Sequence, residues 1–232
     1  MPTFLRENMI IMENALSPEI CEEIKYIGLH SENLYGQVGD GGETPLDIRK
    51  SGVAWLPRDM KLGDGKLLQD DILWPMIQHV NDEWFQFDLT YHEANQFTTY
   101  KAPDEHYNWH ADGGPDLYQN TNPEMPMHTN SETQVGTYRK LSYAIQLCHP
   151  DEYDGGKFQY IDSTRDIASM DWGLIEETVP FRGMEQGSAL FFTSILQHRV
   201  TPVTRGTRHS IAVSYTHLRA HETSLHLVCR LL

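Results

Sequence analysis

One short stretch of the chain, from Tyr100 to Asp112, carries two side chains with the types and spacing of metal ligands. His110 and Asp112 place an imidazole and a carboxylate two residues apart. On an extended strand, side chains at positions i and i+2 point to the same face. The two groups could therefore converge on one metal ion with no turn between them. Because two ligands hold a metal weakly, a third ligand must come from elsewhere in the chain.

His198 is the candidate for the third ligand among the 12 histidines. It follows an apolar run that ends at Leu196 and opens another run typical of a strand, so we expect it at a strand end, like His110. Two histidines and one carboxylate form the facial set of non-haem Fe(II) oxygenases, which leaves coordination positions open. His110 and Asp112 could instead form a structural hydrogen-bonded pair, so the spacing alone does not decide.

A basic side chain follows the third candidate ligand. Arg208 and Ser210 share one face of the next predicted strand, by the same period of two. A guanidinium can grip a carboxylate through two charge-assisted hydrogen bonds. Iron with open positions beside a carboxylate clamp specifies a bidentate co-substrate with a second acid group, and 2-oxoglutarate fits that description. Arg208 could instead be an ordinary surface arginine, although the run from Ser210 to Val213 is typical of a core strand.

Several motifs occur in a fixed order between Val53 and Ala212. They are Val53–Leu56, Tyr100–Asp112, Leu141–Phe158, Gly187–Phe192, His198–Val203 and Arg208–Ser210. Together they make the chain resemble the Fe(II)/2-oxoglutarate-dependent dioxygenases of the prolyl 4-hydroxylase type. Any one of these motifs alone would be unspecific.

The resemblance assigns roles to individual residues. It implies that His110, Asp112 and His198 hold iron, and that Arg208 forms a salt bridge with the distal carboxylate of 2-oxoglutarate. Tyr100 matches a tyrosine whose hydroxyl often helps to hold this co-substrate, although it could equally pack in the core.

Other residues are expected around the same pocket. Gln146 and Ser210 face it by strand parity, which makes them candidates for co-substrate contacts. The run from Gly113 to Gly136 is dense in Pro, Asn, Thr and Met, and a loop of this length is a candidate lid over the substrate.

The resemblance implies an enzyme that uses Fe(II), 2-oxoglutarate and O2, with ascorbate as reductant. It would decarboxylate 2-oxoglutarate to succinate and CO2 while it hydroxylates a proline in a peptide or protein substrate. Two alternatives stay open at this point. The chain could oxidise a free amino acid or another small molecule, or it could be a non-catalytic metal-binding jelly-roll module.

The secondary structure expected to position these residues is helical early in the chain and β-rich later. A helix is expected from Ser17 and Pro18, and a second from Leu73 to Phe85. Short β-rich runs follow, so the pattern predicts an α+β chain with a double-sheet core. The resemblance narrows this core to a double-stranded β-helix (jelly-roll, cupin-like), with packing helices N-terminal to it. The expected strands are Ser51–Leu56, Gln96–Lys101, Tyr107–Ala111, Lys140–Cys148, Lys157–Ile161, Ser188–Thr193, Arg199–Val203 and Arg208–Ser214.

One domain is expected over residues 1–215, helical over about 1–90 and jelly-roll over about 91–215. The sequence pattern changes at residue 216. Residues 216–232 resemble translated sequencing-adapter read-through, so we interpret them as non-native. His217, His221 and His226 could instead be read as a metal-binding helix, because positions i and i+4 share a face. We prefer the read-through interpretation.

Composition excludes several classes of function. A net charge of −15 argues against a nucleic-acid partner, which calls for a basic surface. No apolar run is long enough to cross a membrane, and the first residues lack the pattern of a signal peptide. Cys21, Cys148 and Cys229 are widely spaced, which predicts no disulfide framework and a cytoplasmic location. The sequence does not indicate an oligomeric state.

Overall fold

The computed structural model describes residues 3–5, 9–31, 34–35, 47–89, 91–113, 137–162 and 175–218. Its helical elements are α1 (Pro18–His30), the π-helix η1 (Leu68–Leu73), α2 (Trp74–Val80), the π-helix η2 (Asn81–Phe85) and the 3-10 turns η3 (Pro150–Glu152) and η4 (Phe181–Gly183). The loop predicted after Gly113 falls on residues 114–136, outside the described ranges, as do residues 219–232 of the C-terminal segment.

The strands form two antiparallel sheets. They are β1 (Thr3–Leu5), β2 (Met9–Met12), β3 (Leu34–Tyr35), β4 (Arg49–Lys50), β5 (Gly52–Trp55), β6 (Tyr91–His92), β7 (Gln96–Lys101), β8 (His106–His110), β9 (Thr137–Gln146), β10 (Tyr153–Gly155), β11 (Phe158–Asp162), β12 (Ile175–Thr178), β13 (Ala189–Thr193), β14 (His198–Val200) and β15 (Val203–Leu218). The main sheet runs β1-β2-β13-β9-β15-β7-β5-β3, and the minor sheet runs β12-β11-β14-β8-β4.

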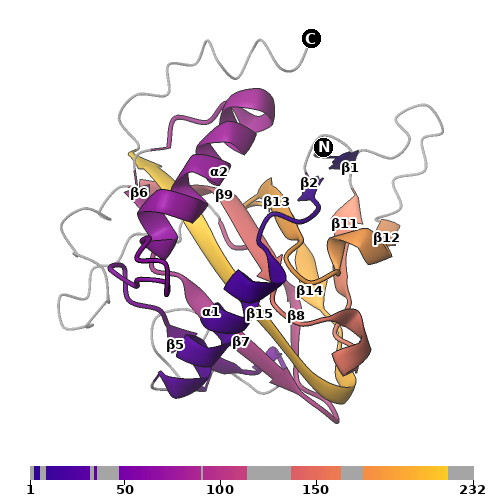
Figure 1. The fold of residues 1–232 in the computed structure, drawn as a ribbon. Helices are drawn as coiled ribbons and strands as arrows, with labels where there is room; N and C mark the ends of the chain where they lie inside the picture. The colour runs from indigo at the N-terminus through magenta and orange to yellow at the C-terminus, as the bar shows by residue number, and fades with distance from the viewer. Residues whose placement is uncertain are drawn as a thin grey trace, which may run out of the picture.

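The two sheets pack against each other through an apolar cluster that includes Phe158 of the minor sheet and Phe192 of the main sheet, with ring centroids 5.4 Å apart. The helices cover the other face of the main sheet (Figure 1). This layering confirms the predicted α+β class with a double-stranded β-helix core. It also gives the main sheet two buried faces, one toward the helices and one toward the minor sheet.

The first 90 residues supply strands as well as packing helices. β2 pairs with β13, where Ile10 lies opposite Phe191, and β5 pairs with β7, where Ala54 lies opposite Phe97. β4 pairs with β8 in the minor sheet. At the other end of the chain, the backbone of β15 pairs with β9 as far as Leu218, so the expected start of the non-native segment at residue 216 falls within a strand. Strand pairing does not reveal the origin of a segment, so the non-native origin of residues 216–232 stays a prediction.

The two predicted helices are present, and a further helical segment precedes the second. Ser17 caps α1, because its hydroxyl accepts a hydrogen bond from the Ile20 amide at 3.4 Å. The second helix was predicted from about Leu73, and α2 begins at Trp74 with Pro75 in its first turn, as expected. A π-helical segment, Leu68–Leu73, precedes it and was not predicted.

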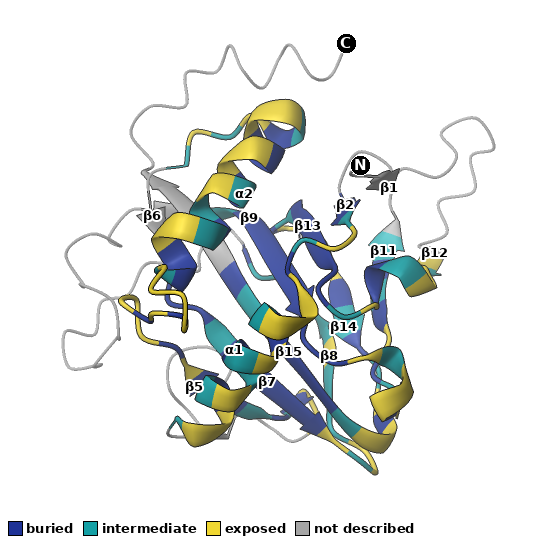
Figure 2. Ribbon diagram, in the orientation of Figure 1, coloured by how far each residue is buried: buried dark blue, intermediate teal, exposed yellow. Residues whose placement is uncertain are grey.

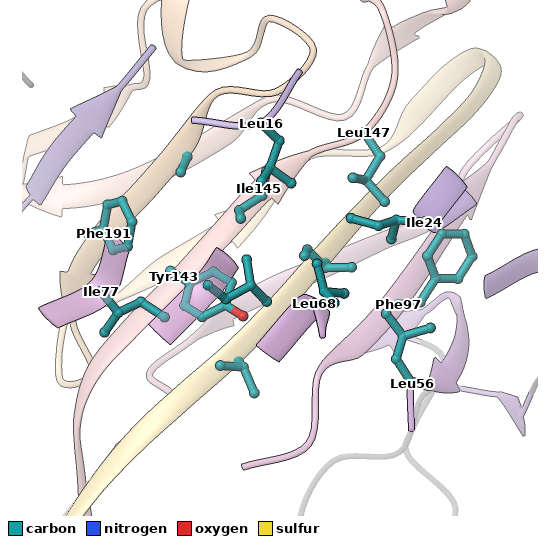
Figure 3. Close-up of a cluster of buried hydrophobic side chains, with 14 of the residues drawn as sticks. Leu16, Ile24, Leu56, Leu68, Ile77, Phe97, Tyr143, Ile145, Leu147 and Phe191 are labelled. Atoms are coloured by element: carbon teal, nitrogen blue, oxygen red, sulfur yellow. The ribbon is translucent and has the colours of Figure 1, made fainter. Parts of the chain in front are cut away.

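The helical layer and the main sheet share the larger core. Figure 3 shows Ile24 and Ile77 of the helices close to Phe97, Tyr143 and Ile145 of the sheet. Figure 2 shows the central strands buried while α1 and α2 expose one side to solvent. None of the helices in the described part of the chain is long and apolar enough to cross a membrane. Cys21 and Cys148 are buried and free, and burial raises their thiol pKa values to about 12 and about 11.

The contact between α1 and the sheet leaves no room for a side chain at Gly28. A Cβ built there would overlap the ring of Phe97. We therefore expect Gly28→Val to lower the free energy of unfolding by about 2–3 kcal/mol, as measured by urea denaturation. Gly63→Ala is the control, because its Cβ would meet only the flexible carboxylate of Glu23, at 3.4 Å. An equal effect of the two substitutions would contradict this account of the helix–sheet contact.

Candidate metal and co-substrate site

Three predicted ligands meet between the two sheets. His110 at the end of β8 pairs directly with His198 at the start of β14. The Oδ1 atom of Asp112 lies 3.6 Å from Nε2 of His110 and 3.8 Å from Nε2 of His198. The ligand atoms of the three residues all lie within 4.8 Å of one another, so a single ion could contact all of them.

Backbone carbonyls orient both imidazoles. Nδ1 of His110 lies 2.8 Å from the carbonyl oxygen of Asn108, and Nδ1 of His198 lies 2.8 Å from that of Leu196. A carbonyl oxygen only accepts hydrogen bonds, so each Nδ1 carries a proton, and in the neutral ring Nε2 is then the nitrogen with the lone pair. Both lone pairs are on the side of Asp112, as a metal site requires.

The charge states also suit a cation. Burial lowers the pKa of His198 to about 4, so this imidazole is neutral at neutral pH. Burial opposes ionisation of Asp112, but His198, His110 and Arg139 together hold its pKa below the usual value. A neutral imidazole at His198 and a carboxylate at Asp112 are the forms in which these two groups bind a metal. The residues present therefore fit Fe(II).

An aromatic ring stacks on each of the two imidazoles and restricts its orientation. Tyr107 stacks on His110 with ring centroids 3.5 Å apart, and Phe158 stacks on His198 at 5.2 Å. The position of Tyr107 depends on a bulge, because the pairing moves from His198↔His110 to Val200↔Tyr107 and skips a residue on β8. Strict alternation would place Tyr107 on the opposite face, so sequence reasoning missed it.

Asp112 also departs from the sequence prediction. The strand was expected to reach Ala111, but β8 ends at His110 and Asp112 lies beyond it. The carboxylate therefore does not reach the histidines through strand periodicity. Arg139 of β9 donates a hydrogen bond from Nη1 to the backbone carbonyl of Asp112 at 3.0 Å.

A second group of predicted residues lies on the same inner face of the main sheet. Arg208 is 1% exposed, and its Nη2 donates to Oε1 of Gln146 at 2.6 Å. The Cζ atom of Arg208 lies 5.5 Å from the ring centroid of Tyr100, and burial raises the pKa of that phenol, so it stays protonated. Ser210 lies directly opposite Gln146 in the ladder between β15 and β9.

Arg208 and Gln146 form a cradle that has unused hydrogen-bonding capacity. Nε and Nη1 of Arg208 and Nε2 of Gln146 are buried and have no hydrogen-bond partner in the described part of the chain. A buried cation with free donors is costly, whereas a carboxylate placed there would accept from all of them. The cradle therefore fits the distal carboxylate of 2-oxoglutarate. Gly156 packs against it so closely that a Cβ would stand 2.9 Å from Cδ of Arg208.

Sequence reasoning missed one further cation near the site. Arg49 is 5% exposed, and it donates from Nε to Ser51 and from Nη2 to Gln96, both at 2.8 Å. Its Cζ lies 4.5 Å from the ring centroid of Tyr107. The pairing of β4 with β8 places Arg49 beside Tyr107, and the residues around Arg49 carry no sequence signal that predicts this pairing.

Comparisons with known proteins point the same way as the geometry. The family model of the 2OG-Fe(II) oxygenase superfamily matches residues 95–216. A PKHD-type hydroxylase of Herminiimonas arsenicoxydans is 31% identical over 104 residues, 45% of this chain and 35% of that protein. The chain thus spans about a third of the length of this curated relative.

Solved structures share the fold. A prolyl-4-hydroxylase of Pseudomonas putida superposes with a TM-score of 0.63 at 15% identity, over 91% of this chain and 94% of that one. A prolyl hydroxylase of Trichoplax adhaerens, in complex with a peptide fragment of the hypoxia inducible factor oxygen degradation domain, gives 0.63 at 14% identity, over 90% and 84%. At these identities, the likeness concerns the fold alone.

Proposed function

The chain belongs to the 2OG-Fe(II) oxygenase superfamily, and we propose that it is a prolyl hydroxylase-like dioxygenase that hydroxylates a proline residue in a peptide or protein. Enzymes of this superfamily use Fe(II), 2-oxoglutarate and O2, and the bound metal supplies the oxidising chemistry. The protein residues hold the reactants in place and keep water from the reacting centre.

The observation that carries the proposal is the pairing of two complementary sites between the sheets. His110, Asp112 and His198 form a donor set for Fe(II) on the minor-sheet side. On the main-sheet side, Arg208 and Gln146 form a cradle with free donors for the distal carboxylate of 2-oxoglutarate. A module that only bound metal would have no need of a buried guanidinium beside it with two donors that lack a partner among the described residues.

Further side chains have proposed places around the co-substrate. The protonated hydroxyl of Tyr100 could donate to 2-oxoglutarate, and Ser210 lies on the same inner face. Tyr107 and Phe158 stack on the two histidine rings, and we expect this cover to limit the access of water to them. Ascorbate would return iron to the Fe(II) state after turnover without substrate.

A peptide is favoured as substrate by the solved relatives. The Trichoplax enzyme, which shares the fold, was solved with a peptide fragment in place. A small-molecule substrate is the second candidate, because the same fold also occurs, with a TM-score of 0.56 at 13% identity, in the alpha-ketoglutarate-dependent epimerase SnoN of nogalamycin biosynthesis. The assay must therefore separate peptides from small molecules.

The test is turnover with identified product. We expect the protein, supplied with Fe(II), ascorbate, 2-oxoglutarate and a library of proline-containing peptides, to release succinate and to add one oxygen atom to a proline. Mass spectrometry with fragmentation would locate the oxygen, and matched peptides with alanine in place of proline are the control. Oxygen gained only by free amino acids would replace the peptidyl substrate with the small-molecule alternative. Absence of succinate from iron-loaded protein under all conditions would favour a binding module.

A further inference from the structure

The metal ligand Asp112 lies in a segment that no strand ladder holds. β8 ends at His110, so the strand ladder does not hold the backbone of Asp112, and other contacts must anchor it. Two are present. Nη1 of Arg139 donates to the carbonyl oxygen of Asp112 at 3.0 Å, and the amide of Gly113 donates to the carbonyl oxygen of Ser194 at 2.7 Å.

Arg139 is itself held in one orientation. Its Nε and Nη2 each donate to a different carboxylate oxygen of Glu93 at 2.6 Å, which is the bidentate geometry of a guanidinium–carboxylate pair. The Glu93 side chain is 10% exposed and that of Arg139 is 26% exposed. Because the guanidinium is planar and rigid, fixing one edge fixes the direction of the remaining donor. That donor is the Nη1 that bonds Asp112.

We infer that Glu93 and Arg139 are positioning residues for the metal ligand Asp112. Glu93 orients the guanidinium, and the guanidinium holds the carbonyl of Asp112 so that its carboxylate faces His110 and His198. The inference rests on the metal site of the proposed function. The hydrogen bond from Nη1 of Arg139 to Asp112 is the reason for preferring a positioning role to a purely structural one. An ion pair that only joined the segment before β7 to β9 would not need to contact a ligand residue.

The packing of Gly113 supports a fixed path for this segment. A Cβ at Gly113 would stand 2.9 Å from the carbonyl oxygen of Arg139 and 2.9 Å from Cβ of Ser194. The chain that leaves Asp112 therefore passes directly against the backbone of Arg139. Asp112 is held through its own carbonyl by the side chain of Arg139, and through the next amide by Ser194.

The test measures metal affinity rather than turnover. We expect Arg139→Gln and Glu93→Gln, made in the full chain, to weaken Mn²⁺ binding by about 10- to 100-fold in calorimetric titration, as loss of a group that orients a metal ligand typically does. The electron paramagnetic resonance spectrum of bound Mn²⁺ should change as well, because the geometry of one ligand is altered. The affinity for 2-oxoglutarate at saturating Mn²⁺ should stay near that of the unmodified protein.

Arg199→Gln is the matched control. Arg199 adjoins the ligand His198, pairs with Glu176 at 3.2 Å and is 29% exposed, close to the exposure of Arg139. Its guanidinium lies over the ring of Trp109, on the outer face of the minor sheet. Removal of Arg199 also breaks a guanidinium–carboxylate pair of the minor sheet, and it should leave Mn²⁺ affinity and spectrum unchanged.

Several outcomes would overturn the inference. Unchanged Mn²⁺ affinity in folded Arg139→Gln and Glu93→Gln, or an equal loss in Arg199→Gln, would reduce the pair to a structural ion pair. If Arg139→Gln does not fold, the near-isosteric Glu93→Gln decides by the same criteria. Failure of the unmodified protein to bind Mn²⁺ would overturn the metal site of the proposed function, and the positioning role with it, so the two failures are distinguishable.

Discussion

A His198→Ala variant is expected to lose bound iron and, with it, all release of succinate. His198 is 4% exposed, and its Nε2 is one of only two imidazole donors in the cluster. Without it, His110 and Asp112 would have to hold the ion alone. No other described histidine, cysteine or carboxylate completes a group of three with them. The loss should exceed that of any positioning variant, because a coordination bond is removed and not merely misaligned.

Iron content after reconstitution and succinate release are the two measurements. His106→Ala is the matched control, because His106 lies on the same strand as His110 and its Nδ1 contacts the carbonyl of Asp104, away from the metal cluster. The control should bind iron and turn over normally. Circular dichroism should show that both variants keep the fold. Iron-dependent turnover that survives His198→Ala would refute the proposed ligand set.

Strand periodicity predicted the part of the site that lies on regular strands. Arg208, Ser210 and Gln146 were expected on one face, and the register of β15 with β9 runs without a shift from Ser210↔Gln146 to Tyr215↔Leu141. Over such a ladder, the period of two holds, and the inner face can be read from the residue types alone. The direct hydrogen bond between Arg208 and Gln146 follows from this regularity.

The same rule failed where the backbone leaves the ladder. β8 contains a bulge that brings Tyr107 onto the face of His110, and it ends before Asp112. Neither feature has a local sequence signal. The ion pair of Glu93 and Arg139 spans 46 positions in sequence, so its formation depends on how β9 and the segment before β7 are placed by β15. Contacts of this kind follow from sheet register, which residue types do not reveal.

An Arg208→Met variant is expected to lose affinity for 2-oxoglutarate by about 100-fold or more, since two charge-assisted hydrogen bonds to a carboxylate contribute about 1.5–3 kcal/mol each. Methionine keeps much of the apolar volume of the arginine stem but offers no donor. Calorimetric titration of the Mn²⁺-loaded protein with 2-oxoglutarate is the measurement. Arg205→Met is the control, because Arg205 is on the same strand, pairs with Asp154 at 2.5 Å and is largely exposed.

Although Arg208→Met should weaken 2-oxoglutarate binding, it should stabilise the fold of the protein without co-substrate. Arg208 is a buried cation whose Nε and Nη1 have no partner in the described structure, so its charge is incompletely solvated until a carboxylate arrives. Arg208→Met should therefore raise the free energy of unfolding of the metal-free chain by about 1–3 kcal/mol in urea denaturation. Gain of stability with loss of 2-oxoglutarate binding would mark Arg208 as a residue kept for its ligand. A loss of stability would make Arg208 a structural residue. So would an equal loss of affinity for 2-oxoglutarate and for peptide, because removal of a guanidinium that only supports the fold should affect both affinities alike.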